Sequence, residues 1–163
     1  MPLSIHLAIH FILAVAVGYL AGKHYKNMPL AIVVAVCGGF FIDLDHVLEY
    51  LLVFGPHFNI LYFIQGRQFL TSDQTHLWFH AWEYIPLLLG LGYLLRKNKI
   101  VQTILITLAF SMGIHLLSDT IINDVPINFY SLIYREQAGF QSKNLIGSEN
   151  YRKNQELKQD LGL

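Results

Sequence analysis

The chain has 163 residues, of which 54% are hydrophobic and 13% are Asp, Glu, Lys or Arg, whereas a soluble domain carries about 25% charged residues. Eleven basic and eleven acidic residues cancel, so no net charge attracts a nucleic acid. The single cysteine, Cys37, excludes a secreted module held by intrachain disulfides. Eight histidines stand beside the eleven Lys and Arg. These features predict a small, histidine-rich protein of the lipid bilayer.

Four segments have the length and apolar content of membrane-spanning helices, which need about 20 residues. In chain order they cover residues 3–22, 28–54, 75–95 and 100–122. The two short connections between the first and second segments and between the third and fourth predict two antiparallel helical hairpins. The sequence thus predicts an all-α fold, an integral membrane four-helix bundle. A soluble bundle is the alternative, but almost no polar face remains for water to wet.

The remaining chain divides into a long connection and a polar end. Residues 55–74 join the second and third segments and contain an apolar patch at 60–64. After Pro126 the chain becomes polar, which predicts an interfacial segment followed by a solvated tail. We therefore expect a transmembrane four-helix domain at 1–125 and a separate polar region at 126–163.

Basic residues predict how the bundle is oriented, because Lys and Arg favour the cytoplasmic side. The two tight loops hold five of them, whereas the long connection holds only Arg67. This places the tight loops in the cytoplasm and both termini outside. The first segment lacks a basic start and a small-residue cleavage site, so we expect a retained helix and not a signal peptide.

Polar side chains lie at one common depth in all four segments. At 1.5 Å per helical residue, His10, Asp43, His80 and His115 lie about 18, 22, 24 and 22 Å from the tight loops. Ionisable groups inside a bilayer are costly, so a compensating partner is expected. Helical spacing also pairs His6 with His10, and His115 with Asp119, on shared faces. His76, His80 and Glu83 have the spacing of a third such set.

Neutral imidazoles together with carboxylates are ligands of Zn²⁺, Mn²⁺ or Fe²⁺. We expect one or two divalent ions, Zn²⁺ in first place, because a cation explains how buried acids stay ionised. Asp43 and Asp45 reach one centre only if the second helix ends or bends near Gly38 and Gly39. The predicted metal ligands are His6, His10, Asp43, Asp45, His46, His80, His115 and Asp119.

Such a centre activates water and polarises an ester or phosphoryl oxygen. Asp45, Glu49 and Glu83 are the predicted catalytic residues; either glutamate would take up a proton or orient a ligand histidine. Arg67 is the predicted contact for a phosphate or carboxylate of the substrate. The expected substrate is a small amphipathic or phosphorylated molecule.

Four motifs resemble those of a known family. Gly38 to His46 reads G-G-F-F-I-D-L-D-H and is similar to the G-x-x-x-P-D-x-D-H motif of the YdjM-like inner-membrane metal-dependent hydrolases, with Ile42 in place of Pro. S-I-H at 4–6, F-H-A-W-E at 79–83 and G-I-H-L-L-S-D at 113–119 resemble the family's other motifs. The resemblance implies a multi-pass protein of a bacterial-type inner membrane that hydrolyses phosphoesters or lipids with a metal.

Three other functions remain open on the sequence. A proton- or metal-ion-coupled transporter also uses buried Asp, Glu and His, but it needs polar residues that continue toward the tight loops. A haem carrier would place histidines beside an apolar macrocycle and not beside several acids. A non-catalytic polar network would need buried Lys or Arg to balance the acids.

Overall fold

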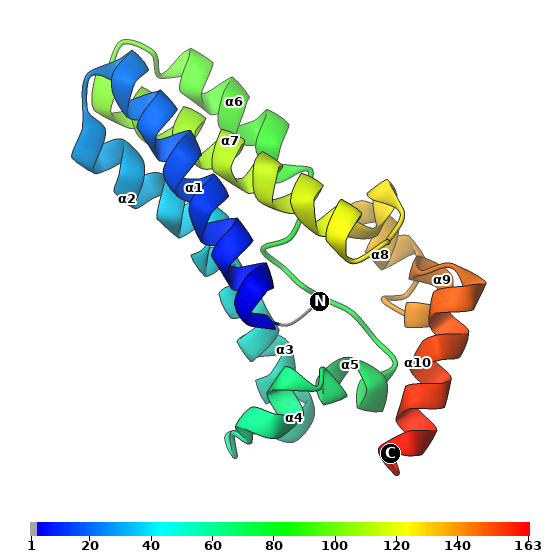
Figure 1. Ribbon diagram of the computed structural model, residues 1–163. Helices are drawn as coiled ribbons and strands as arrows, with labels where there is room; N and C mark the ends of the chain where they lie inside the picture. Colours follow the sequence, from blue (N-terminus) through cyan, green and yellow to red (C-terminus); the bar gives the residue numbers. More distant parts are fainter. Residues whose placement is uncertain (1–2) are drawn as a thin grey trace.

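The structure is a computed structural model that describes residues 3–163, so the first two residues of the predicted 1–125 domain lie outside the described residues. The fold is all-α (Figure 1). The helices that build the bundle are α1 (Leu3–Tyr25), α2 (Met28–Gly39), α6 (Tyr84–Leu94) and α7 (Lys99–Ile122). The other elements are η1 (Phe41–Asp43), α3 (Leu44–Phe54), α4 (Ile60–Ile64), α5 (Arg67–Ser72), η2 (Ile127–Tyr130), α8 (Leu132–Gln137), α9 (Ser142–Leu145) and α10 (Ser148–Asp160).

Within residues 3–163, three helical segments are long and apolar enough to cross a membrane: α1, the α2–α3 segment at Met28–Phe54, and α7. Large apolar side chains on them point outward, among them Ile12, Val33 and Ile121, each more than 60% exposed. An apolar exterior on long helices is what a bilayer requires. The expected pairing into hairpins is present, since α1 packs against α2 and α6 against α7.

Small residues bring the long helices close together, as is usual for helices in membranes. Gly18 and Gly22 of α1 face α2 at Ala31, and Gly39 faces α7 at Ser111. The Ser111 hydroxyl donates a hydrogen bond of 2.6 Å to the carbonyl oxygen of Ala35. This close packing fixes the relative heights of the polar side chains at the far ends of α1, α2 and α7.

The second predicted segment bends where the glycine pair indicated. Helix α2 ends at Gly39, the 3-10 turn η1 follows, and α3 starts at Leu44. Asp43 in the turn and Asp45 in α3 therefore project from different local backbone conformations. The distortion brings both carboxylates toward the same region of the bundle.

The predicted third helix is wrong over its first half. Only Tyr84–Leu94 is helical, and residues 75–83 form an irregular segment. Backbone amides of this segment form hydrogen bonds with residues distant in sequence. The amide of Phe79 donates to the carboxylate of Asp45, and the amide of Trp82 donates to the carbonyl of Tyr130. Long-range partners satisfy these amides outside a helix. The expected set of three polar residues on one helix face therefore does not exist.

The long connection and the polar end are more structured than expected. Residues 55–74 contain the short helices α4 and α5. Beyond Pro126, Phe129, Tyr130 and Leu145 are buried and pack against Leu77 and Leu116 in a small core. Helix α10 carries most of the solvated polar side chains at this end. In Figure 1 helices α8, α9 and α10 stand to one side of the bundle, with α10 beside α5.

The close approach of α1 to α2 generates a stability prediction. A Cβ atom at Gly18 would lie 2.7 Å from the Cα of Ile32, a backbone atom that cannot rotate away. We expect Gly18→Ala to lower the unfolding temperature of the detergent-solubilised protein, at a cost of about 1–3 kcal/mol. Gly90→Ala is the matched control, because a Cβ there meets nothing within 4 Å and alanine favours helix. Equal unfolding temperatures for the two variants would contradict the helix contact.

Candidate metal centre

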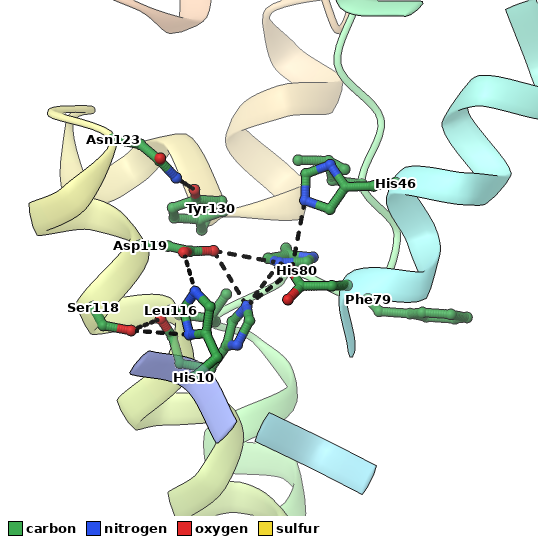
Figure 2. Close-up of polar contacts among 12 residues, drawn as sticks. His10, His46, Phe79, His80, Leu116, Ser118, Asp119, Asn123 and Tyr130 are labelled. Carbon is green, nitrogen blue, oxygen red and sulfur yellow. Dashed lines mark hydrogen bonds and ion pairs between the residues drawn. The ribbon is translucent and has the colours of Figure 1, made fainter. Parts of the chain in front are cut away.

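All eight predicted metal ligands meet at the end of the bundle away from the tight loops. They fall into three groups whose donor atoms lie within 4.8 Å of one another. The first group contains Asp43, His80, His115 and Asp119; the second contains His6, His10 and Asp119; the third contains Asp45, His46 and His80. Figure 2 shows Asp119 in contact with His10 on one side and His80 on the other, with His46 beyond His80. The four predicted segments thus supply one shared cluster.

The first group has the spacing of a tetrahedral metal site. His80 Nε2 lies 3.0 Å from His115 Nε2, 3.4 Å from Asp43 Oδ1 and 3.5 Å from Asp119 Oδ2. His115 Nε2 lies 3.5 Å from Asp43 Oδ1 and 3.2 Å from Asp119 Oδ2. Ligand atoms placed tetrahedrally at about 2.0–2.1 Å from Zn²⁺ lie about 3.3 Å apart. The distances between the two imidazole nitrogens, and from each of them to the two carboxylate oxygens, therefore match one four-coordinate ion.

The second group shares Asp119 with the first. His10 Nε2 lies 2.8 Å from Asp119 Oδ1 and 2.8 Å from His6 Nε2, and His6 Nε2 lies 3.3 Å from the same oxygen. Asp119 therefore presents Oδ2 to the first group and Oδ1 to the second. A carboxylate placed in this way is able to bridge two divalent ions.

Hydrogen bonds orient three of the histidines so that Nε2 faces the cluster. His80 Nδ1 donates to Asp45 Oδ2 at 2.9 Å, and His115 Nδ1 donates to the carbonyl of Gly39 at 3.0 Å. His10 Nδ1 lies 3.3 Å from Ser118 Oγ, whose own hydrogen goes to the carbonyl of His115. These partners assign the ring proton to Nδ1 and leave Nε2 as a lone-pair donor. Metal-binding histidines are commonly fixed in this manner.

The acids of the cluster lack the partners that buried charges need. Asp43 Oδ1 and Oδ2, Asp45 Oδ1 and Asp119 Oδ1 are buried without a hydrogen-bond partner. Within residues 3–163 no Lys or Arg forms an ion pair with any of these three acids. Converging nitrogen lone pairs and unpartnered carboxylate oxygens repel one another unless a cation lies between them. The residues present therefore fit one or two divalent ions.

Asp45 and His46 form the outer part of the cluster. Asp45 is 1% exposed and contacts His80 through Nδ1, the ring nitrogen on the side away from the first group. His46 is partly exposed, and its Nε2 lies 3.7 Å from Asp43 Oδ1. Asp45 thus orients a ligand in this geometry, while His46 lies where the cluster borders the open part of the molecule.

The structure gives the two glutamates and Arg67 other contacts. The buried carboxylate of Glu49 accepts hydrogen bonds from the ring and backbone of His76. The carboxylate of Glu83 accepts hydrogen bonds from the Ser131 hydroxyl and from the amides of Leu132 and Ile133 at the start of α8. Arg67 stacks its guanidinium over the ring of Tyr62, 4.2 Å from the centroid. Their predicted roles in proton transfer and substrate binding stay predictions.

Arg135, a residue outside the bundle that no sequence motif indicated, supports the centre. Its side chain is completely buried, and its guanidinium donates to the carbonyls of Leu77, His80 and Phe129 at 3.0, 2.7 and 3.3 Å. Burial lowers the pKa of Arg135, although the charges of Asp45 and Glu83 act in the opposite direction. Arg135 fixes the irregular segment that carries His80. Two of these carbonyls, those of Leu77 and His80, are more than fifty residues away in sequence, and a lone arginine in a polar segment carries no signal for such partners.

Tyr130 is a second residue that the sequence analysis did not select. Its hydroxyl oxygen accepts a hydrogen bond from Asn123 at 3.1 Å (Figure 2). Burial, together with the charge of Asp119, raises the pKa of Tyr130 well above its usual value. The phenol is therefore a neutral hydrogen-bond donor beside the cluster.

Comparisons of the chain with protein-family models, with curated proteins and with solved structures find no match. What the centre can bind therefore follows from its donor atoms, which are imidazole nitrogens and carboxylate oxygens. This donor set suits Zn²⁺, Mn²⁺ and Fe²⁺.

The shared carboxylate generates a prediction about metal stoichiometry. We expect two ions per chain after loading with Zn²⁺, because two donor groups meet at Asp119. His6→Ala should leave one ion, and Asp119→Asn should lower occupancy at both positions. His24→Ala and Asp124→Asn, at exposed positions, serve as controls. Elemental analysis of the purified protein measures the result, and full occupancy in Asp119→Asn would contradict the bridge.

The buried guanidinium generates a prediction about metal affinity. Arg135→Lys keeps the charge but loses the planar fork that reaches three carbonyls. We expect its affinity for Zn²⁺ to fall by about 10–100-fold, as for other residues that orient metal ligands. Arg152→Lys on the solvated face of α10 is the matched control, since Arg152 is 72% exposed. Competition with a fluorescent zinc chelator measures both, and equal affinities would show that Arg135 does not support the centre.

Proposed function

We propose that the protein is a multi-pass membrane enzyme, a metal-dependent hydrolase of phosphoesters or lipid-like esters. The observation that carries the proposal is the pair of donor groups joined through Asp119. Two ions held 3.5–4 Å apart by such a bridge are typical of enzymes that hydrolyse phosphoesters. The similarity of its motifs to those of the YdjM-like hydrolases supports the same chemistry.

In this proposal the residues of the chain divide into three tasks. Asp43, His80, His115 and Asp119 would hold one ion, and His6 and His10 would hold a second with Asp119. Divalent ions bound there would lower the pKa of a water molecule and polarise the phosphoryl or carbonyl oxygen of the substrate. Asp45 keeps the His80 ring oriented.

His46 and Tyr130 line a cavity of about 450 Å³ next to the cluster. Both are therefore placed to contact a substrate that enters it. The Tyr130 hydroxyl is available to donate a hydrogen bond to a substrate oxygen. His46, which is partly exposed, is the imidazole of the cluster that reaches the cavity.

The membrane arrangement we propose uses four segments. Helices α1, α2–α3 and α7 cross the bilayer, and α6 accompanies them. With 11 residues, α6 spans about 16 Å, short of the roughly 30 Å hydrocarbon core. The irregular segment before it covers the remaining depth inside the protein, where non-helical backbone is tolerated. The basic tight loops favour the cytoplasm, which places the centre near the opposite face of a bacterial-type inner membrane.

A transporter is the second candidate function for this cluster, and the structure supports it less well than hydrolysis. The buried side chains between the centre and the tight loops are small or hydroxylic, as at Ala14, Ala31, Ala35, Thr103 and Thr107. Among residues 3–163 no buried acid or histidine lies in that half of the bundle. A proton or metal pathway would need such groups there.

Hydrolysis of a simple phosphodiester tests the proposed function. We expect the Zn²⁺-loaded protein to hydrolyse methyl p-nitrophenyl phosphate, and chelation to abolish the reaction. Asp45→Asn should lower kcat/KM by about 10–100-fold because His80 loses its orienting acceptor, whereas Asp124→Asn should match the unmodified protein. Release of p-nitrophenol is followed by absorbance. A loaded protein no faster than the metal-free protein would contradict the proposed reaction.

A further inference from the structure

The cavity beside the cluster joins the metal centre to the outer helices. At one end it is lined by His46 and Tyr130, and at the other by Lys153 and Leu157 of α10. Its volume of about 450 Å³ lies in the range of sites that enclose small-molecule ligands. A molecule in it therefore reaches the bundle end from the side of α10.

The walls between these ends are mainly apolar. Phe69 and Leu70 of α5, Leu77 and Phe129 face the cavity, as does Leu157. These apolar side chains favour contact with a hydrocarbon group. Polar side chains line other parts of the same cavity, among them Gln65, Thr75, Ser142, Asn150 and Asn154.

The cavity lies between helices α4 and α5, which have an apolar outer surface, and helix α10, which has a charged outer surface. Outside the α5 wall, α4 exposes Ile60, Leu61 and Ile64, each more than half accessible. On the other wall, α10 exposes a face with Arg152 and Glu156. An apolar exterior next to a charged one marks the boundary between hydrocarbon and water.

Charge differs between the two ends. Lys153 is paired with Glu149 at 2.9 Å, so the α10 end presents little net charge to a ligand. At the other end, the metal-binding groups would hold divalent cations, and the Tyr130 hydroxyl is a hydrogen-bond donor. An anionic group is thus favoured at His46 and Tyr130, and an uncharged apolar group at Leu157.

We infer that this cavity binds an amphiphile, with an anionic phosphoester head at His46 and Tyr130 and a hydrocarbon chain along Phe69, Leu77 and Leu157. The inference rests on the proposed function, because it names the substrate class of that same centre. It assigns recognition of the chain to α5 and α10, two elements that hold no metal ligand.

A photoreactive probe tests where the chain binds. The probe is dodecylphosphocholine with a diazirine at the chain end, added to Zn²⁺-loaded protein in nanodiscs, and labelled peptides are identified by mass spectrometry. We expect label on residues 69–77 or 157 and a reduction of about tenfold in Leu157→Trp, which fills the cavity. Gln159→Trp is the matched control, because Gln159 lies on the opposite face of α10. Leu157→Gln, similar in size but polar, should also reduce labelling.

A pair of substrates tests recognition of the chain during hydrolysis. We expect decyl p-nitrophenyl phosphate to have a KM about tenfold or more below that of the methyl ester, because each buried methylene favours binding by roughly fourfold. Leu157→Trp should remove this preference, measured as the ratio of the two KM values, whereas Gln159→Trp should keep it. Metal content and unfolding temperature equal to those of Gln159→Trp show that the variant is folded.

The outcomes separate this inference from the proposed function. Label confined to residues that do not line the cavity, or equal labelling of the two tryptophan variants, overturns the inference even if the methyl ester is hydrolysed. Cavity labelling without hydrolysis of either ester supports the binding site and contradicts the reaction. If both tryptophan variants keep the preference for the decyl ester, the chain binds elsewhere.

Discussion

The structure depends on compensation of negative charge that is buried at the end of an apolar bundle. Asp45 and Asp119 are almost completely buried, and an isolated carboxylate in such a place is strongly unfavourable. The nearest groups are imidazoles whose Nδ1 protons already point to Asp45, Gly39 and Ser118. A single shared proton would satisfy one pair of nitrogen atoms. Two groups of converging donors, linked through Asp119, need more positive charge than that, and divalent cations bound at the two groups would supply it.

The scaffold achieves this convergence by combining rigid helices with one irregular segment. Small residues lock α1, α2 and α7 together, so His10, Asp43 and His115 arrive at fixed heights. His80 comes from a segment that is not helical, and its position depends on long-range polar contacts. Asp45 binds its ring and the amide of Phe79, and Arg135 binds its carbonyl. The same carboxylate thus orients the His80 ring and accepts a hydrogen bond from the backbone segment that carries it.

Regular features of the sequence were sufficient to predict much of this arrangement. Apolar length identified the long helices, tight loops identified the hairpins, and counting residues from those loops placed His10, Asp43 and His115 at one depth. Hydropathy could not reveal that residues 75–83 leave the helix, because an apolar irregular segment and an apolar helix have the same composition. The deciding partners, Asp45, Tyr130 and Arg135, are distant in sequence. For the same reason no local pattern predicted that Glu83 caps α8 or that Arg135 is buried.

The position of the centre suits a reaction that needs both lipid and water. A centre in the middle of the bundle would be closed by the small residues that pack α1 against α2, and a centre on α10 would lie away from hydrocarbon. The cluster instead lies where the apolar helices end, and His46 connects it to a cavity with one apolar wall and one helix exposed to solvent. In the binding that we propose, the chain of an amphiphile lies along Phe69, Leu77 and Leu157, while its phosphoester head lies at His46 and Tyr130. The two parts of one molecule then contact side chains from different helices.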